Sequence, residues 1–234
     1  VDYDNYGISG IEKYFDKELK NEHLLDQALK LTLDSNIQYI ISKELNNSIK
    51  TFDATGGGAL LMDVNNGDII SLVSSPSYNP NSFVHGVELG YWQSLINNDR
   101  KPLINKAISG LYPPGSTIKT LVALSALENK IIKPSNTVRC KGKIELYGEK
   151  FHCWKKEGHG IMNLRSGMKR SCDVYFYEIA RKLGVDRLSK TAKKFGLGKK
   201  VLRNFVEERS GVVPSTSWKK KYIGQNWYIG ETLH

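Results

Sequence analysis

Long apolar runs are missing from this chain of 234 residues. No uninterrupted stretch approaches the ~20 apolar residues that a membrane-spanning helix needs, and the start does not resemble a signal peptide. We therefore expect the protein to be soluble or to have its anchor outside these residues, since the first residue is Val1 and not Met. The 7 prolines and 21 glycines are too few for a collagen-like or low-complexity sequence.

Acidic residues are in the minority. The chain has 24 Asp and Glu residues against 34 Lys and Arg residues, which gives a formal charge of +10. Such a surplus suits a nucleic acid, an anionic membrane face or an anionic polymer. The basic residues are scattered, however, in short runs such as 155–156, 199–200 and 219–221, and no nucleic-acid-binding motif is present. We therefore expect no nucleic-acid partner.

Patterns of apolar residues predict a helix-rich domain with some antiparallel sheet. Residues 30–34 alternate between polar and apolar, which is typical of a strand, and Asp34 or Ser35 then caps a helix. The apolar residues of that helix recur at i, i+3, i+4 and i+8: Ile37, Ile40, Ile41 and Leu45.

Turn signals and helical periods organise the rest of the chain. Two apolar runs, 59–64 and 68–73, flank an Asn-Gly turn and predict a hairpin. Residues 79–114 are expected to be loop-rich, and residues 133–160 irregular, since they lack a clear hydrophobic period. The join over 21–27 looks abrupt, as if residues were missing there. Further helices are predicted over 11–19, 116–129, 163–170, 174–183 and 186–195.

Ser116 and Lys119 form a candidate catalytic pair. Both lie at the start of the predicted 116–129 helix, so their side chains share one face of its first turn. A helix N-terminus stabilises negative charge on a nucleophile, and burial of a lysine in an apolar helix favours its neutral, basic form. The alternative is that Ser116 only caps the helix, because S-x-x-K sequences are common by chance.

Residues 112–119, YPPGSTIK, resemble the first active-site motif of penicillin-binding proteins, whose motif set is S-x-x-K, S-D-N and K-T-G. The second motif is matched by residues 171–173, an S-x-D form followed by VYFY that is similar to elongation-type class B members. No K-[ST]-G follows, so we expect the third motif beyond His234. Other segments similar to that type are GIEKY at 10–14, MDV at 62–64, GDIISLVSSP at 67–76, NPNSF at 79–83, and ERSG at 208–211 with Pro214 and Trp218.

The resemblance implies a fold and a division of the chain. The fold is the α+β fold shared by penicillin-binding proteins and serine β-lactamases: an antiparallel sheet with helices on both sides and a central buried helix, here incomplete at the C-terminal end. Residues 1–29 would end a non-catalytic N-terminal domain, and residues 30–234 would form the transpeptidase domain. Members of the family hold this domain in the bacterial periplasm on an inner-membrane anchor, which is absent from these residues.

The resemblance also implies a reaction. Such a D,D-transpeptidase cross-links peptidoglycan stem peptides in cell elongation, is acylated by β-lactams, and needs no cofactor for its chemistry. Ser116 would be the nucleophile, Lys119 the general base and Ser171 a proton relay, while Asp173 would contact Lys119 or the substrate amide. From the residues alone, Ser171 and Asp173 could simply cap the next helix. The expected protein partner is a membrane-embedded glycan polymerase of the elongation machinery.

The three cysteines lie close together in the sequence. Cys140, Cys153 and Cys172 join His159 in the spacing C-x12-C-x5-H-x12-C, which suits tetrahedral zinc, with His152 as a rival ligand. A Cys140–Cys153 disulfide with Cys172 free, or three unrelated thiols, are the alternatives. Because Cys172 lies inside the second motif, a metal at this position would fix the motif in place.

Two other functions compete with transpeptidation. A serine β-lactamase, or a β-lactam sensor, shares the fold, but a lactamase needs a glutamate that activates water. Glu207 and Glu208 are available, yet they lie in or beside the segment that matches the class B pattern. A non-catalytic cell-wall scaffold is the second alternative, and the presence of all four expected catalytic residues argues against it.

Overall fold

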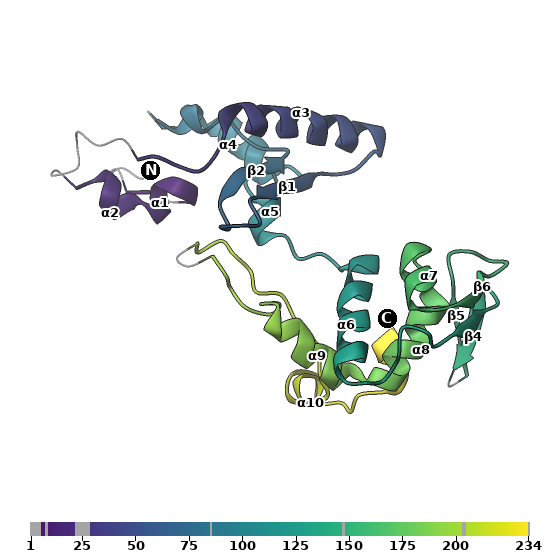
Figure 1. The fold of residues 1–234 in the computed structure, drawn as a ribbon. Helices are drawn as coiled ribbons and strands as arrows, with labels where there is room; N and C mark the ends of the chain where they lie inside the picture. The colour runs from purple at the N-terminus through teal and green to yellow at the C-terminus, as the bar shows by residue number, and fades with distance from the viewer. Residues whose placement is uncertain are drawn as a thin grey trace. The chain divides into compact units, whose positions relative to one another are not determined.

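The computed structural model describes residues 6–7, 9–21, 29–84, 86–146, 148–202 and 205–233. Its contacts divide the chain into two compact units, whose α-helices and most strands are labelled in Figure 1. Unit 1 comprises residues 1–111 and 202–209, and unit 2 comprises residues 112–201 and 210–234. The junction predicted over 21–27 lies almost wholly outside the described residues, and the boundary between residues 29 and 30 stays a prediction. No described helix is long and apolar enough to cross a membrane.

A hairpin between two helices organises unit 1. β1 (Gly57–Met62) pairs antiparallel with β2 (Ile69–Ser75), which confirms the hairpin predicted from the Asn-Gly turn. A side chain at Gly57 would meet α3 (Ser35–Thr51), whereas one at Gly58 would meet the backbone at the start of α5 (Lys106–Ser109). Successive strand residues point to opposite faces, so the two helices cover opposite faces of the hairpin. Both glycines are needed because the helices approach the strand closely.

The N-terminal helix prediction is confirmed with an interruption. α1 (Gly10–Tyr14) and α2 (Asp16–Leu19) replace the single helix predicted over 11–19, and they break at Phe15. The loop-rich interpretation of 79–114 is wrong in part, because this segment holds η2 (Pro80–Phe83), α4 (Leu89–Ile96) and α5. These helices have at most 8 residues, too short for a clear period.

Residues 30–34 do not form the predicted strand. Only the Thr32 hydroxyl and the Asp34 N–H reach backbone carbonyls of β2, which is too few bonds for a strand ladder. Ile40, predicted on the apolar face of α3, is instead 56% exposed. Because α3 packs on one face of a two-stranded hairpin, its buried stripe is narrower than the sequence pattern.

Asp34 caps α3 as predicted, and its replacement should destabilise the helix. Its carboxylate accepts the backbone N–H groups of Asn36 and Ile37, both at 2.9 Å. We expect Asp34→Ala to lower the free energy of unfolding by about 1 kcal/mol, measured by urea denaturation. Ser35→Ala is the matched control at the next position. Equal effects of the two substitutions would contradict a capping role for Asp34.

Unit 2 is built around the helices predicted from the sequence. α6 (Ile118–Glu128) packs against α8 (Asp173–Leu183) and α9 (Val185–Lys194), and α7 (Leu164–Lys169) contacts both α6 and α8. The unit ends with α10 (Thr216–Ile223) and η4 (Ile229–Leu233), which packs on α8. Eight of the 11 residues of α6 are buried or half-buried, which supports the prediction of a central helix. The buried side chains at the centre include Val122, Ala126, Phe176, Ile179 and Leu183.

Residues 133–160 are not irregular as predicted. β3 (Val138–Cys140) pairs with β6 (Gly160–Met162), and β4 (Lys143–Leu146) pairs with β5 (Glu149–His152). Strands of three or four residues are too short to give a visible alternation, which explains the wrong interpretation. The described strands therefore form three separate two-stranded antiparallel sheets.

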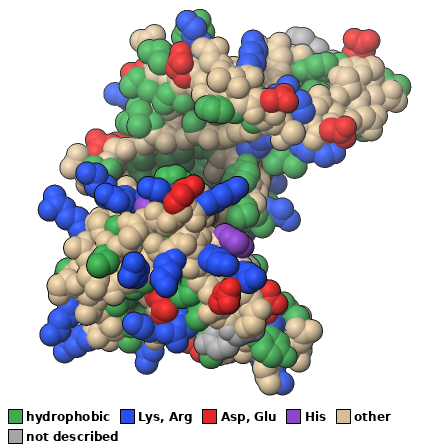
Figure 2. Space-filling model, turned by 90° about the vertical axis from the view of Figure 1, so that its right-hand side faces the viewer, with side chains coloured by type: hydrophobic (Ala, Val, Ile, Leu, Met, Phe, Trp, Pro, Cys, Tyr) green, Lys and Arg blue, Asp and Glu red, His purple; other side chains and the backbone are tan. Residues whose placement is uncertain are grey.

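The charge of the chain is divided unequally. Unit 2 holds 23 Lys and Arg residues against 8 Asp and Glu residues, a formal charge of +15, whereas unit 1 holds 11 against 16, a charge of −5. Figure 2 shows blue basic side chains interspersed with acidic and uncharged groups on the visible face. The basic surplus predicted from composition is thus a property of unit 2.

Candidate active site

Ser116 lies on the surface, one turn before the central helix. It belongs to η3 (Gly115–Thr117), a single 3₁₀ turn that runs directly into α6. The α-helix itself begins at Ile118, so the prediction that Ser116 opens it is off by two residues. The consequence for Ser116 is small, because the turn keeps its side chain on the face of Lys119.

Lys119 is the centre of the site. Its Nζ lies 3.0 Å from Ser116 Oγ, 3.0 Å from Ser171 Oγ, 3.1 Å from the Ser171 carbonyl oxygen and 2.5 Å from Asp173 Oδ1. An ammonium group has only three N–H bonds for these four oxygen neighbours. A neutral amine has two N–H bonds and one lone pair, and the hydroxyl of Ser116 can donate to that lone pair. Lys119 is 9% exposed, so water competes little for these contacts.

The second motif meets the first around Lys119. Ser171 Oγ donates to Ser116 Oγ at 3.0 Å, which completes a triangle of the two hydroxyls and the amine. Ser171 has a φ of +47°, a left-handed conformation that is uncommon for a residue other than glycine. Cys172 is the N-cap of α8 and makes no side-chain capping bond, so the simple capping interpretation of this motif is not supported.

Asp173 is held by two donors. Its Oδ1 pairs with Lys119, and its Oδ2 accepts the backbone N–H of Trp154 at 3.0 Å. Burial alone would raise the pKa of Asp173, but the hydrogen bonds from Lys119 and Trp154 outweigh it and hold that pKa below its ordinary value. Asp173 is therefore a carboxylate at neutral pH.

Gly167 sets the path of the turn that leads to the second motif. Its carbonyl accepts the Cys172 N–H at 2.9 Å, and a Cβ at this position would lie 2.7 Å from the ring of Tyr175, which is 1% exposed. We expect Gly167→Ala to cost about 1–3 kcal/mol of stability, measured by chemical denaturation. Gly90→Ala is the control, since a Cβ there would meet nothing closer than 3.6 Å. An equal loss of stability in the two variants would show that the close contact between Gly167 and Tyr175 does not require glycine.

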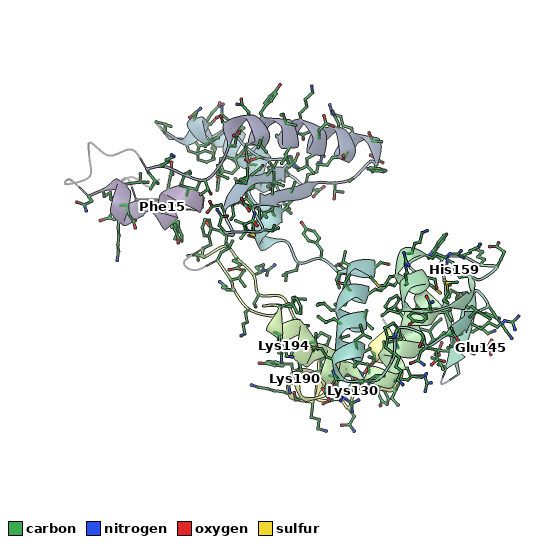
Figure 3. All side chains as sticks on the ribbon, in the orientation of Figure 1. Phe15, Lys130, Glu145, His159, Lys190 and Lys194 are labelled. Carbon is green, nitrogen blue, oxygen red and sulfur yellow. The ribbon has the colours of Figure 1, made fainter. Side chains whose placement is uncertain are left out.

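The four predicted metal ligands come together. Cys140, Cys153, His159 and Cys172 are all buried, and their ligand atoms lie within 4.8 Å of one another. His159 Nδ1 is 3.4 Å from Cys153 Sγ and 3.8 Å from Cys140 Sγ, and Figure 3 labels His159 at this cluster. All three cysteines are free, and the rival ligand His152 is not part of the cluster among the described residues.

The protonation of the cluster follows from its burial. Burial raises the pKa of the Cys172 thiol to about 12. For His159, burial and then the charges of Lys155 and Arg170 lower the pKa, so the imidazole is neutral at neutral pH. Burial alone would raise the pKa of Cys140, but hydrogen bonds from the backbone of Gly142 and His159 lower that pKa overall. A neutral imidazole beside thiols is the donor set that a soft or borderline cation binds after displacing the thiol protons.

Trp154 is a site residue that sequence reasoning missed. Besides its backbone bond to Asp173, its indole N–H donates to the Arg170 carbonyl at 3.1 Å, and its ring lies edge-on to His159 at 5.2 Å. It thus links the Cys/His cluster to the second motif. Its position next to Cys153 was the only available signal, and a single tryptophan beside a cysteine predicts no contact 19 residues away.

Comparison with known proteins gives a consistent set of relatives. The chain matches the family described as "Penicillin binding protein transpeptidase domain" over residues 57–230. It is 38% identical to the peptidoglycan D,D-transpeptidase MrdA of Escherichia coli K12, covering 97% of this chain and 38% of that protein. It is 37% identical to MrdA of Acinetobacter baumannii, covering 88% of this chain and 30% of the relative. The chain therefore spans about a third of the length of these curated relatives.

Solved structures give the same result. PBP2 of Pseudomonas aeruginosa, determined in complex with WCK 5153, is 37% identical with a TM-score of 0.84, covering 97% of this chain and 51% of that one. The penicillin-binding protein PBP2 of Helicobacter pylori, determined in complex with MreC, is 36% identical with a TM-score of 0.85, covering 97% of this chain and 45% of that one.

Proposed function

Because this chain belongs to the family of penicillin-binding protein transpeptidase domains and has its α+β fold, we propose that it is part of an elongation-type peptidoglycan D,D-transpeptidase. The observation that carries the proposal is the hydrogen-bonded group of Ser116, Lys119, Ser171 and Asp173. A nucleophile within reach of a base, with that base oriented by a third group, is the arrangement that covalent acyl transfer needs.

Acylation is the first half of the proposed reaction. Ser116 Oγ attacks the carbonyl carbon of the penultimate D-alanine of a stem peptide, and its proton passes to neutral Lys119. The C–N bond then breaks, and the departing D-alanine amine takes the proton from Lys119 through the Ser171 hydroxyl. That hydroxyl lies 3.0 Å from both Lys119 Nζ and Ser116 Oγ. Asp173 keeps the amine of Lys119 facing the two hydroxyls.

Deacylation reverses these proton transfers. The amine of a neighbouring stem peptide attacks the ester carbonyl of the acyl-enzyme and gives up a proton to Lys119 through the Ser171 hydroxyl. The Ser116–acyl bond breaks, Ser116 Oγ regains its proton from Lys119, and the new amide is the cross-link. A β-lactam would enter the first half of this reaction by opening its ring on Ser116.

Labelling with a penicillin tests the assignment of the nucleophile. The protein at its full natural length is treated with a fluorescent penicillin, digested, and mapped by mass spectrometry. We expect one adduct, on the peptide that contains Ser116, and none in Ser116→Ala. Ser94→Ala, which removes another hydroxyl from an exposed serine, is the control and should label normally. An adduct elsewhere, or a labelled Ser116→Ala protein, would refute the proposal.

A structural zinc ion fits the Cys/His cluster. Bond lengths of about 2.3 Å to sulfur and 2.05 Å to nitrogen at a tetrahedral angle place sulfur and nitrogen about 3.6 Å apart. The two observed separations, 3.4 and 3.8 Å, bracket this value. We propose that Cys140, Cys153, His159 and Cys172 hold the ion and that it acts as a structural staple. No step of the reaction involves it, because Ser116 and Lys119 are not among its ligands.

The setting of the reaction is also proposed from the relatives. We place the catalytic domain in the periplasm, attached to the bacterial inner membrane by a segment outside this chain. Stem peptides are its substrates and β-lactams its inhibitors. Its protein partners would belong to the elongation machinery, such as a membrane-embedded glycan polymerase. The MreC complex of the Helicobacter pylori relative supports partners of this kind.

The competing functions have less support. Glu207 accepts the N–H of Gly10, and Glu208 accepts the N–H of Leu202, both at 2.9 Å. Each carboxylate is thus occupied in a backbone contact and is not presented to a hydrolytic water, which disfavours a β-lactamase. A scaffold without activity would not need the aligned hydroxyls of Ser116 and Ser171.

A further inference from the structure

The second motif is bordered by an unneutralised basic surface. We define the basic rim as five exposed side chains: Lys155, Lys156, Arg165, Lys169 and Arg170. The sequence from residue 154 to residue 170 contains one acidic residue, Glu157. Within the described part of the chain, no ion pair and no side-chain hydrogen bond involves any of the five. Two other exposed lysines of unit 2, Lys143 and Lys194, do have acidic neighbours.

The structure brings the two halves of the rim together at the site. Arg170 directly precedes Ser171, and its carbonyl accepts the indole N–H of Trp154 at 3.1 Å. Trp154 directly precedes Lys155 and donates its backbone N–H to Asp173. Arg165 and Lys169 are four residues apart on α7 and so share one of its faces.

We infer that the basic rim is a binding subsite for the carboxylates of a peptidoglycan strand. This inference rests on the proposed function and specifies the part of the substrate that lies outside the reacting bond. Stem peptides carry free carboxylates, which exposed cations attract. Because these cations have no acidic partners, no ion pair has to break when they bind such a polymer. The indole of Trp154, which is 65% exposed among these cations, adds a flat apolar surface for the strand.

Neutral variants of the rim test this inference. In the full-length protein, K155Q, K156Q, R165Q and K169Q are combined, and binding of soluble, uncross-linked peptidoglycan strands is measured by fluorescence anisotropy. We expect affinity to fall about tenfold, with a weaker dependence on salt. The matched control removes four other exposed lysines of unit 2 (K130Q, K182Q, K190Q and K193Q) and should change affinity less than about twofold. Lys130 and Lys190 are labelled in Figure 3.

Two further measurements separate the possible outcomes. Strands whose carboxylates have been converted to amides should bind the wild-type protein about as weakly as native strands bind the rim variant. Equal loss of affinity in the rim and control variants, or unchanged binding of amidated strands, would overturn the inference. So would a rim variant that loses binding only to vesicles of anionic phospholipid. Thermal unfolding checks that the variants fold.

Penicillin labelling of wild-type Ser116 is scored separately. If labelling succeeds while strand binding ignores the rim, the inference fails and the proposed function stands. If Ser116 is not labelled, the proposed function fails.

Discussion

Replacement of Lys119 by alanine is expected to slow acylation of Ser116 by a β-lactam about 10³–10⁴-fold. Lys119 is the only described basic side chain within hydrogen-bond reach of Ser116 Oγ, at 3.0 Å. Without it, the Ser116 proton has no acceptor other than water or the Ser171 hydroxyl. The second-order rate constant of acylation, measured with a chromogenic cephalosporin, gives the effect directly.

Lys119→Arg separates base catalysis from ion pairing. Arginine can still pair with Asp173, but it does not lose a proton in proteins and so is no base. We therefore expect Lys119→Arg to lose nearly as much activity as Lys119→Ala while retaining more stability. Lys190→Ala, an exposed lysine on α9, should leave the rate unchanged. An arginine variant within tenfold of wild type would rule out Lys119 as the base.

Removal of the proposed zinc should lower stability and activity together. Protein purified without added metal is expected to contain about one zinc ion per chain. Chelation, or Cys172→Ser, should lower the midpoint of thermal unfolding by roughly 10 °C, which corresponds to about 3–5 kcal/mol in a protein of this size. Acylation should slow as well, because Cys172 lies between Ser171 and Asp173 and its release frees the turn that holds both side chains.

The distinction between a metal and mere packing needs a control. Met162→Ala removes another buried side chain of the same core, 4% exposed, without removing a ligand. It should lower stability but leave zinc content at the wild-type level, measured by atomic emission. A Cys140–Cys153 disulfide with no bound metal, or a Cys172→Ser protein with full zinc content, would contradict the proposed site.

The sequence was most informative where a pattern extends over several turns or carries its own chemistry. The Asn-Gly hairpin, the Asp34 cap and the helices over 163–170, 174–183 and 186–195 are confirmed, and so is the family fold. Residues 171–173 could be placed beside Ser116 only through the resemblance. A spacing of 55 residues between two serines has no local signature, and tertiary packing alone brings them to 3.0 Å.

The wrong predictions and the missed residue all concern contacts that the local sequence does not determine. The strands of residues 138–162 are three or four residues long, so their pairing depends on partners that periodicity cannot reveal. The strand predicted at 30–34 had the correct alternation but lacks a ladder of backbone partners. Trp154 contacts Asp173 through its backbone N–H, a group that every residue except proline possesses. Residue identity therefore gave no sign of its contact with Asp173.

The left-handed backbone of Ser171 sets stability against activity at one position. A φ of +47° costs a residue with a Cβ of order 1 kcal/mol, and glycine would avoid that cost. Glycine, however, would remove the hydroxyl that bridges Ser116 and Lys119. Selection for a more heat-resistant protein should therefore favour Ser171→Gly, whereas selection for cross-linking should retain the serine. The protein is thus less stable than it would be with glycine here, and in return it holds a hydroxyl at this point.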